Sequence, residues 1–321
     1  MYFDQSTKIY VAGHRGLAGS AICRELNSQG YQNLITKTHQ ELDLEDQKIT
    51  EEFISDIKPD VVILAAAKVG GILANNEYPV DFLMRNLAIQ SNVIKSAFKA
   101  QVKRLLFLGS SCIYPKNCPQ PIREEYLFTS ELESTNRPYA IAKIAGIEMC
   151  WSYNRQFNTK YLAAMPTNLY GPNDNYDLDN SHVLPALIRK FHQAKINNIP
   201  TVEVWGTGLP KREFLYSEDL AKGIIHLINL NYDDFKNLTK PNICPIINIG
   251  TGEDITIKEL ATKIKKIVQY NGEIFFNTRK PDGTPRKLLK VNKIKSLGWT
   301  HTIDLDVGIN NIYNDFKSKK L

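Results

Sequence analysis

The segment Lys8-Ile9-Tyr10-Val11-Ala12-Gly13-His14-Arg15-Gly16-Leu17-Ala18-Gly19 carries the main signal for the fold of this chain. Its first five residues form a short run with β propensity, and the glycines stand directly before a helical pattern over residues 18–29. Glycines let a backbone turn sharply and approach a pyrophosphate, and a helix N-terminus supplies free N–H groups and positive potential. Glycines also serve turns that bind nothing, but the position of this turn between the first strand and the first helix favours a dinucleotide site.

Strand and helix signals alternate through the rest of the first half of the chain. Nearly continuous apolar strands between helices predict an α/β fold, a Rossmann-type doubly wound parallel sheet with helices on both faces. Strands are expected over residues 33–36, 61–67, 104–109 and 161–168, and helices over residues 46–57, 78–100 and 136–157.

A change of composition after Gly171-Pro172 predicts a domain boundary, because the following residues are rich in Asn, Asp and Pro. We expect residues 1–171 to form a dinucleotide-binding Rossmann domain, which the chain rejoins over about residues 213–243. Residues 172–321 are then expected to form mainly a smaller C-terminal α/β domain that binds the substrate.

Composition excludes several classes of protein. The 321 residues are 43% hydrophobic and 23% charged, which is typical of globular chains. The net charge of +6 is spread along the chain without a basic tract, which argues against nucleic acid and suits an anionic small molecule. The five cysteines are scattered without a C-x-x-C pair, so neither a disulfide framework nor a metal site is expected. With no signal-peptide pattern and no apolar run of membrane-spanning length, we expect a cytoplasmic protein without a membrane partner.

Cations near the end of the second expected strand indicate the kind of dinucleotide. Lys37 and His39 follow this strand, Arg15 lies in the glycine turn, and the first acidic residue after the strand is Glu41. An acidic residue at this place would bind the ribose 2′-OH of NAD, whereas basic residues suit the 2′-phosphate of NADP. The pattern therefore favours NADPH/NADP+, with solvated surface charges as the alternative interpretation.

A tyrosine and a lysine in the expected helix 136–157 indicate proton transfer. Tyr139 and Lys143 are four residues apart and share one face of that helix. A free tyrosine has a pKa of about 10, and a nearby ammonium would lower that pKa to give an acid/base group for an alcohol–ketone couple. Ser110 and Ser111 end the strand 104–109, where their hydroxyls can hold a substrate carbonyl, although one of them can equally be only a helix cap.

Together these features resemble the extended short-chain dehydrogenase/reductases and, among them, the epimerase-reductases that make GDP-L-fucose. The resemblance runs almost end to end. The segments that carry it are Ala12-Gly13-His14-Arg15-Gly16, Ala65-Ala66-Ala67-Lys68-Val69-Gly70-Gly71-Ile72, Leu108-Gly109-Ser110-Ser111-Cys112-Ile113-Tyr114-Pro115, Pro138-Tyr139-Ala140-Ile141-Ala142-Lys143, Met165-Pro166-Thr167-Asn168-Leu169-Tyr170-Gly171-Pro172, Asn180-Ser181-His182-Val183 and Lys280-Pro281-Asp282-Gly283-Thr284-Pro285-Arg286-Lys287.

The resemblance implies an activity and roles for five residues. A GDP-sugar, GDP-4-keto-6-deoxy-D-mannose, would be epimerised at C3 and C5 and then reduced at the C4 ketone with NADPH to give GDP-L-fucose. Ser110, Tyr139 and Lys143 would be the reductase triad, and Cys112 and His182 the epimerisation pair, with acid and base left unassigned. Taken alone, Cys112 is more typical of a packed thiol and His182 of a surface residue at a helix start.

The resemblance also implies binding residues and a homodimer in which the helices of residues 78–100 and 136–157 pair across subunits. In this family an arginine commonly follows the second strand, so the lysine at position 37 predicts a less strict NADP preference. The cofactor would contact Gly13, His14, Arg15, Gly16, Leu17, Ala18, Gly19, Lys37, Leu108, Gly109, Ser110, Ser111, Lys143, Pro166, Thr167, Asn168, Leu169 and His182. The nucleotide sugar would contact Lys190, Trp205, Arg212, Asp282 and Arg286.

Three alternatives stay open. A GDP-mannose 4,6-dehydratase or a UDP-sugar 4-epimerase would share the fold but would not need the pair formed by Cys112 and His182. A protein that senses NADP(H) without turnover would not need Tyr139 and Lys143.

Overall fold

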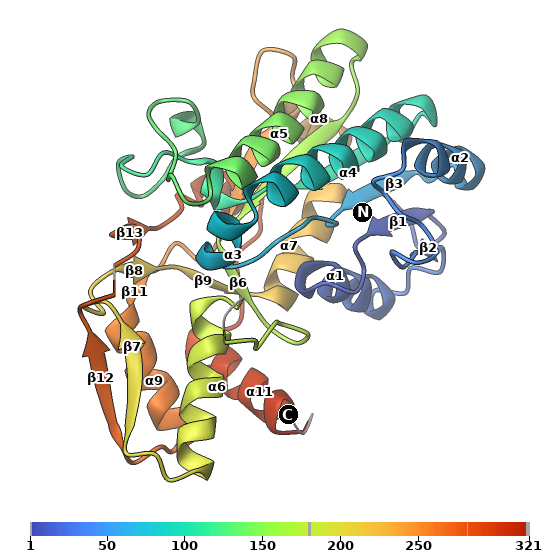
Figure 1. Cartoon of the computed structure of the whole chain (residues 1–321). Helices are drawn as coiled ribbons and strands as arrows, with labels where there is room; N and C mark the ends of the chain where they lie inside the picture. The colour runs from blue at the N-terminus through green and yellow to red at the C-terminus, as the bar shows by residue number, and fades with distance from the viewer. Residues whose placement is uncertain (1, 179–180, 281, 319–321) are drawn as a thin grey trace.

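A sheet of six parallel strands forms the centre of the protein in the computed structural model (Figure 1). The strands are β1 (Ile9–Ala12), β2 (Leu34–Ile35), β3 (Val61–Leu64), β4 (Arg104–Leu108), β5 (Tyr161–Pro166) and β10 (Ile246–Ile249). They lie in the order β10-β5-β4-β3-β1-β2, and every neighbouring pair is parallel. The predicted fold class is therefore confirmed. The strand order reverses at β1, and sheets of this kind bind ligands beyond the carboxyl ends of the strands at such a point.

The structure describes residues 2–178, 181–280 and 282–318, without the side chains of Ile72 and Leu73. Asn180 and Pro281, two positions in the family segments quoted above, lie outside the described residues.

Helices cover both faces of the sheet, which is why β1, β3, β4 and β5 are buried at every position. On one side, α4 packs against α2 and α5, and on the other side α1 packs against α7 (Figure 1). The helices that surround this sheet are α1 (Leu17–Ser28), α2 (Gln47–Ile57), α3 (Ile72–Glu77), α4 (Pro79–Lys99), α5 (Arg137–Phe157), α7 (Ser217–Ile228), α8 (Tyr232–Leu238) and α10 (Asn292–Ser296).

The second half of the chain builds a smaller α/β unit, which forms the lower part of Figure 1. Its core lies between α6 (Val183–Ile196), α9 (Ile257–Val268) and α11 (Leu305–Ser318), beside the parallel pair β7 (Thr201–Trp205) and β12 (Glu273–Asn277). A capping box of Thr256 and Glu259 starts α9.

Short strands lie between the two units, because the chain crosses from one to the other there. β6 (Asn168–Tyr170) pairs with β9 (Phe214–Tyr216), and β8 (Lys211–Arg212) pairs with β11 (Ile255–Thr256) and β13 (Arg286–Lys287). Two short 3-10 helices, η1 (Ser111–Ile113) and η2 (Glu124–Tyr126), follow β4.

Two hydrophobic clusters correspond to these two units. The first contains the central sheet and extends to buried residues between positions 215 and 249 and between 289 and 299. The second lies between positions 170 and 316. Domain limits near residue 171, with a return over about 213–243, stay our prediction, and the first cluster reaches beyond that return through β10. None of the described helices combines the length and apolar character needed to cross a membrane.

Candidate active site

The glycine turn between β1 and α1 has the geometry of a phosphate-binding turn. Gly13 has φ +87°, and a Cβ there would lie 2.6 Å from the amide nitrogen of Ala66, so this position requires glycine. A Cβ on Gly19 would lie 2.1 Å from the Gly13 carbonyl oxygen, which keeps α1 close to the turn. At Gly16 a Cβ would meet only the Gly13 oxygen at 3.6 Å, so the space in front of that residue is open.

The N-terminus of α1 has no side-chain cap and no acidic residue in its first turn. Its amides and its positive dipole end are therefore free to bind an anion. The buried Nδ1 of His14, in the same turn, has no hydrogen-bond partner among the described residues. An open space, uncapped amides and an unpaired buried nitrogen together fit the pyrophosphate of a dinucleotide.

The cations predicted to bind a 2′-phosphate lie beside acidic residues. Lys37 Nζ is 3.4 Å from Glu41 Oε1, and His39 Nδ1 is 3.5 Å from Asp43 Oδ1. Glu41 also accepts the backbone N–H of Thr38, and this bond is the main reason that the pKa of its carboxyl is lowered to about 2. A phosphate bound to Lys37 would therefore share the lysine with the Glu41 carboxylate, which stays ionised.

The predicted reductase residues lie against one another. Ser110 ends the turn after β4, and its Oγ accepts the N–H of Cys112 at 3.2 Å and shares a hydrogen bond with Tyr139. Lys143 is one turn further along α5, with Nζ 5.8 Å from the centre of the Tyr139 ring. The ammonium donates to the carbonyl of Leu108 at 2.7 Å. It is Ser110, and not the buried Ser111, that faces the tyrosine.

Burial changes the expected protonation of this pair. Burial raises the pKa of Tyr139, and only the Ser110 hydrogen bond acts in the other direction. The expected lowering of the tyrosine pKa by Lys143 is not seen in this structure, because desolvation of Tyr139 itself dominates. Lys143 is 3% exposed, and burial lowers its own pKa to about 7. Tyr139 is therefore held as a neutral phenol, the form that donates a proton.

The predicted epimerisation residues come from two separate elements. Cys112 lies in η1, and His182 is the N-cap residue of α6. Between them stands Lys287 of β13, whose Nζ is 3.7 Å from Cys112 Sγ. His182 is exposed at its edge, but desolvation by the surrounding protein atoms lowers its pKa and the charge of Lys287 lowers it further, which favours the neutral imidazole.

Four of the five predicted substrate residues surround one region of the smaller unit. Trp205 is 47% exposed at the end of β7, which excludes a core role. Lys190 of α6 approaches the Trp205 ring to 5.7 Å. Asp282 accepts the N–H of Thr207 at 2.9 Å, and Arg212 interacts electrostatically with both Asp282 and Cys112. Arg212 therefore links the predicted nucleotide site to the predicted epimerisation site.

Arg286, the fifth predicted substrate residue, points elsewhere. Its Nε donates to Asp254 Oδ2 at 2.5 Å. Neighbouring residues of a strand project to opposite faces, so Arg286 and Lys287 cannot both face Cys112. The structure therefore separates Arg286 from the other four residues.

The other predicted cofactor residues lie at the carboxyl ends of the strands. Pro166 is the last residue of β5, Leu108 is the last residue of β4, and Gly109 follows it. Thr167 Oγ1 and Asn168 Nδ2 donate to the carbonyl of Glu213 at 3.3 and 2.8 Å. These residues therefore lie at the sheet edge, and the side chains of Thr167 and Asn168 bind the backbone of Glu213, the residue after Arg212.

Three residues near these sites were missed by the sequence analysis as site residues. Lys287 lies beside Cys112, Lys280 lies 5.1 Å from the centre of the Trp205 ring, and Glu213 is a fully buried carboxylate that follows Arg212. Lys280 and Lys287 belong to a segment that carried the family resemblance, which was the only available signal. Nothing in the local sequence distinguishes Glu213 from a surface acid.

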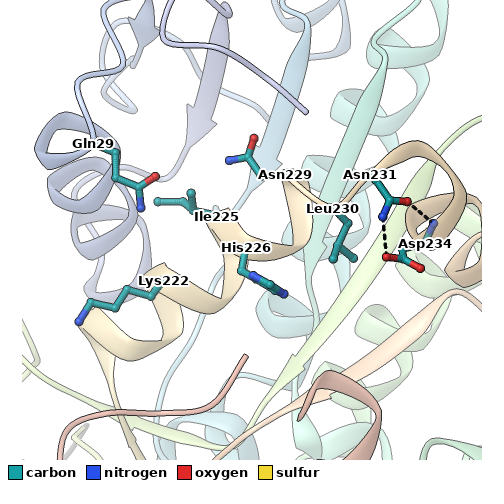
Figure 2. A pocket seen from close by; sticks show the side chains of 8 residues that line it. All are labelled: Gln29, Lys222, Ile225, His226, Asn229, Leu230, Asn231 and Asp234. Carbon is teal, nitrogen blue, oxygen red and sulfur yellow. Dashed lines mark hydrogen bonds between the residues drawn. The ribbon is translucent and has the colours of Figure 1, made fainter. Parts of the chain in front are cut away.

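A separate hollow of about 430 Å³ lies between α7 and α8, away from all these residues (Figure 2). In Figure 2 the side chains of Asn231 and Asp234 bond to each other, as N-cap and first-turn residues of α8. The hollow is lined by Gln29, Lys222, Ile225, His226, Asn229, Leu230, Asn231 and Asp234.

Comparisons with known proteins agree with the geometry. The model of the NAD dependent epimerase/dehydratase family matches residues 9–250. GDP-L-fucose synthase 1 of Arabidopsis thaliana is 55% identical over 311 residues, which are 97% of this chain and 93% of that protein. GDP-L-fucose synthase of Escherichia coli (strain K12) is 51% identical over 309 residues, 96% of each chain.

A solved structure shares the whole architecture. MlghC, a GDP-mannoheptose C4 reductase from Campylobacter jejuni with NADP bound, is 42% identical and has a TM-score of 0.89, over 98% of this chain and 99% of that chain. The predicted resemblance is thereby confirmed. The chain belongs to the NAD dependent epimerase/dehydratase family and, within it, to the GDP-L-fucose synthases.

Proposed function

We propose that the chain converts GDP-4-keto-6-deoxy-D-mannose to GDP-L-fucose by epimerisation at C3 and C5 and NADPH-dependent reduction of the C4 ketone. The observation that carries this proposal is that one short segment joins two proton-transfer sets. Ser110 hydrogen-bonds Tyr139 and also accepts the N–H of Cys112, so a sugar ring held at Ser110 lies beside both the phenol and the thiol. The names of the relatives support the substrate class.

The residues of the cofactor site fit NADPH. The glycine turn and the amides of α1 would hold the pyrophosphate, and Arg15 and Lys37 would contact the 2′-phosphate. Lys143 would contact the nicotinamide ribose, since it lies beside the carbonyl of Leu108 at the end of β4. When bound, NADPH supplies the hydride that reduces the C4 carbon.

Tyr139 supplies the proton for the reduction. As hydride reaches C4, the carbonyl oxygen becomes an alkoxide and takes the phenolic proton. Burial keeps Tyr139 protonated until that moment, and the Ser110 hydroxyl orients the same oxygen.

Cys112 and His182 exchange protons with C3 and C5. The C–H bond at either carbon breaks, its proton passes to one of the two residues, and the electron pair enters the C4 carbonyl as an enolate. Return of a proton to the opposite face of the ring inverts the carbon. A thiol and an imidazole both exchange protons near neutral pH.

The GDP part of the substrate would bind at the smaller unit. Trp205 offers an exposed aromatic face, and Lys190 and Arg212 offer positive charge for the diphosphate. The interaction of Arg212 with Cys112 connects this site to the sugar site.

The test is NADPH oxidation with GDP-4-keto-6-deoxy-D-mannose, with the product analysed by NMR in D2O. GDP-L-fucose with deuterium at C3 and C5 is the expected product. Tight NADPH binding without oxidation would contradict the proposal and favour a 4,6-dehydratase, a 4-epimerase or a sensor.

A homodimer in the cytoplasm is part of the proposal. Val80 and Met84 on α4 are 68% and 56% exposed, and Ile141 on the adjacent α5 is also exposed. Apolar side chains on two neighbouring helices support pairing of these helices across subunits. Light scattering should give twice the mass of one chain, and Met84→Glu should shift it toward the monomer. The free cysteines support a reducing compartment.

A further inference from the structure

We propose that Lys287 is a positioning residue for the epimerisation: its ammonium holds the Cys112 sulfur in place and balances its negative charge whenever the thiol has lost its proton. The inference rests on the proposed function, and it applies to Cys112 as acid or as base. In both roles the sulfur is an anion for part of the cycle, because the proton that leaves or reaches C3 or C5 passes through it.

The contact itself is direct. Lys287 Nζ lies 3.7 Å from Cys112 Sγ, within hydrogen-bond reach of a sulfur acceptor. Among the described residues, no carboxylate forms an ion pair with Lys287. Its charge is therefore available to the sulfur.

The direction of the Lys287 side chain follows from strand pairing. In β13, Lys287 stands opposite Arg212 of β8, the other cation that interacts with Cys112. Its neighbour Arg286 projects to the opposite face and is paired with Asp254. The alternation of the strand thus assigns one cation to the site and one to the outer surface.

Buried hydrogen bonds fix the segment that follows Lys287. Leu289 N–H donates to Glu213 Oε2 at 2.8 Å, and Leu288 N–H donates to Gln120 Oε1 at 2.9 Å. The other oxygen of Glu213 accepts the Gly252 N–H at 2.7 Å, and Glu213 is 0% exposed. A fully buried carboxylate with both oxygens bonded is a rigid anchor, so the backbone that carries Lys287 is held in place beside Cys112.

Several other ionisable groups lie near Lys287 or near the Cys112 sulfur. Tyr139 of α5 and Arg212 of β8 interact with the Cys112 sulfur, and His182 at the start of α6 interacts with Lys287. Cys118, in the loop after η1, also lies within reach of the Lys287 charge. The pH dependence of Cys112 reactivity therefore reports on this whole group, and only a change specific to position 287 identifies the role of the lysine.

The experiment compares alkylation of Cys112 by iodoacetamide in Lys287→Met, Lys287→Arg and the parent, between pH 6 and 9, by peptide mass spectrometry. Burial raises the pKa of Cys23, Cys150 and Cys244, which slows their reaction. We expect Lys287→Met to slow Cys112 alkylation at pH 7 about tenfold and Lys287→Arg to restore most of the rate. Lys290→Met, in the same segment, is the matched control and should react like the parent.

The second readout is deuterium entry at C3 and C5 of the sugar. Lys287→Met should lower the maximal rate of exchange about tenfold with little change in KM. A raised KM with normal alkylation would identify Lys287 as a diphosphate ligand and overturn the proposal. If Cys112 is alkylated at the parent rate in both Lys287→Met and Lys287→Arg, the proposed role of Lys287 is overturned. This holds even if the protein makes no GDP-L-fucose, because alkylation is measured without a sugar. If Lys287→Met does not fold, an unchanged alkylation profile in Lys287→Gln has the same consequence.

Discussion

Two lysines lie beside residues that we propose to transfer protons, and different parts of the fold place them there. Lys143 is four residues from Tyr139 on the same helix, is almost completely buried, and donates to a backbone carbonyl. Lys287 is brought to Cys112 from a distant part of the chain by the pairing of β13 with β8. One lysine is set by local helix geometry, and the other depends on the relative position of the two units.

The electrostatic surroundings of the two lysines also differ. Burial lowers the pKa of Lys143 to about 7, so keeping this lysine protonated in the folded protein lowers the free energy of unfolding. Lys287 is only partly buried and faces a sulfur. Around Lys143 the proposed reductase residues are buried or partly buried, whereas around Lys287 the proposed epimerisation residues are partly buried or exposed.

The largest expected effect is on the reductase half. Tyr139→Phe should lower the rate of NADPH oxidation by about 10³-fold or more, because the C4 oxygen then lacks its proton donor. Cofactor affinity, measured by fluorescence titration, should stay within about twofold of the parent. Tyr153→Phe on the same helix is the control, and unchanged turnover in Tyr139→Phe would remove the phenol from the mechanism.

Lys143→Met tests the cost of the buried ammonium. The difference between 10.5 and about 7 corresponds to about 5 kcal/mol, and loss of the Leu108 hydrogen bond offsets about 1.5 kcal/mol of it. The unfolding free energy at pH 6 should therefore rise by about 3.5 kcal/mol while reduction is lost.

The sign of this effect depends on pH. Below pH 7 the folded and unfolded lysine are both protonated, so the full cost of burial is present. As the pH rises from 7 toward 10.5 only the unfolded chain keeps the proton, and the parent gains stability. The advantage of Lys143→Met should shrink over that range in urea titrations, and a constant difference would mean that burial does not lower the pKa of Lys143.

A smaller effect is expected from the thiol. Cys112→Ser should slow deuterium entry at C3 and C5 about 10²-fold, because a serine hydroxyl gives up its proton far less readily. NADPH binding should not change. Cys23→Ser in α1 is the matched control, and exchange equal to that of the parent in Cys112→Ser would return Cys112 to the role of a packed thiol.

The smallest effect is expected from changing Glu213, which anchors the segment that follows Lys287. Glu213→Gln places an NH2 group against either the Gly252 or the Leu289 N–H, both of which need an acceptor. The unfolding free energy should fall by about 1–3 kcal/mol. Glu253→Gln, an exposed neighbour, should change it little, and equal stability of the two variants would show that the Glu213 bonds are dispensable.

Local geometry explains which site residues could be predicted from the sequence. The order of strands and helices, the glycine turn and the pair formed by Tyr139 and Lys143 are matters of short-range spacing. The roles of Cys112 and His182 came from the family resemblance, because isolated cysteine and histidine residues carry no chemical signal of their own.

Other features depend on contacts between distant segments. The sequence could not tell which of Arg286 and Lys287 faces the site, because strand alternation orients them only once the pairing of β13 with β8 is known. It also could not show that burial raises the pKa of Tyr139, since desolvation depends on everything packed around the group.

The sequence by itself determined the α/β class, the glycine turn after the first strand and the shared helix face of Tyr139 and Lys143, because each follows from residues within a few positions of one another. Only the tertiary structure decided the exposure of Trp205, the anchor at Glu213 and the contact of Lys287 with Cys112. The physical reason is that burial, strand direction and electrostatic pairing are set by residues that meet only after the chain has folded.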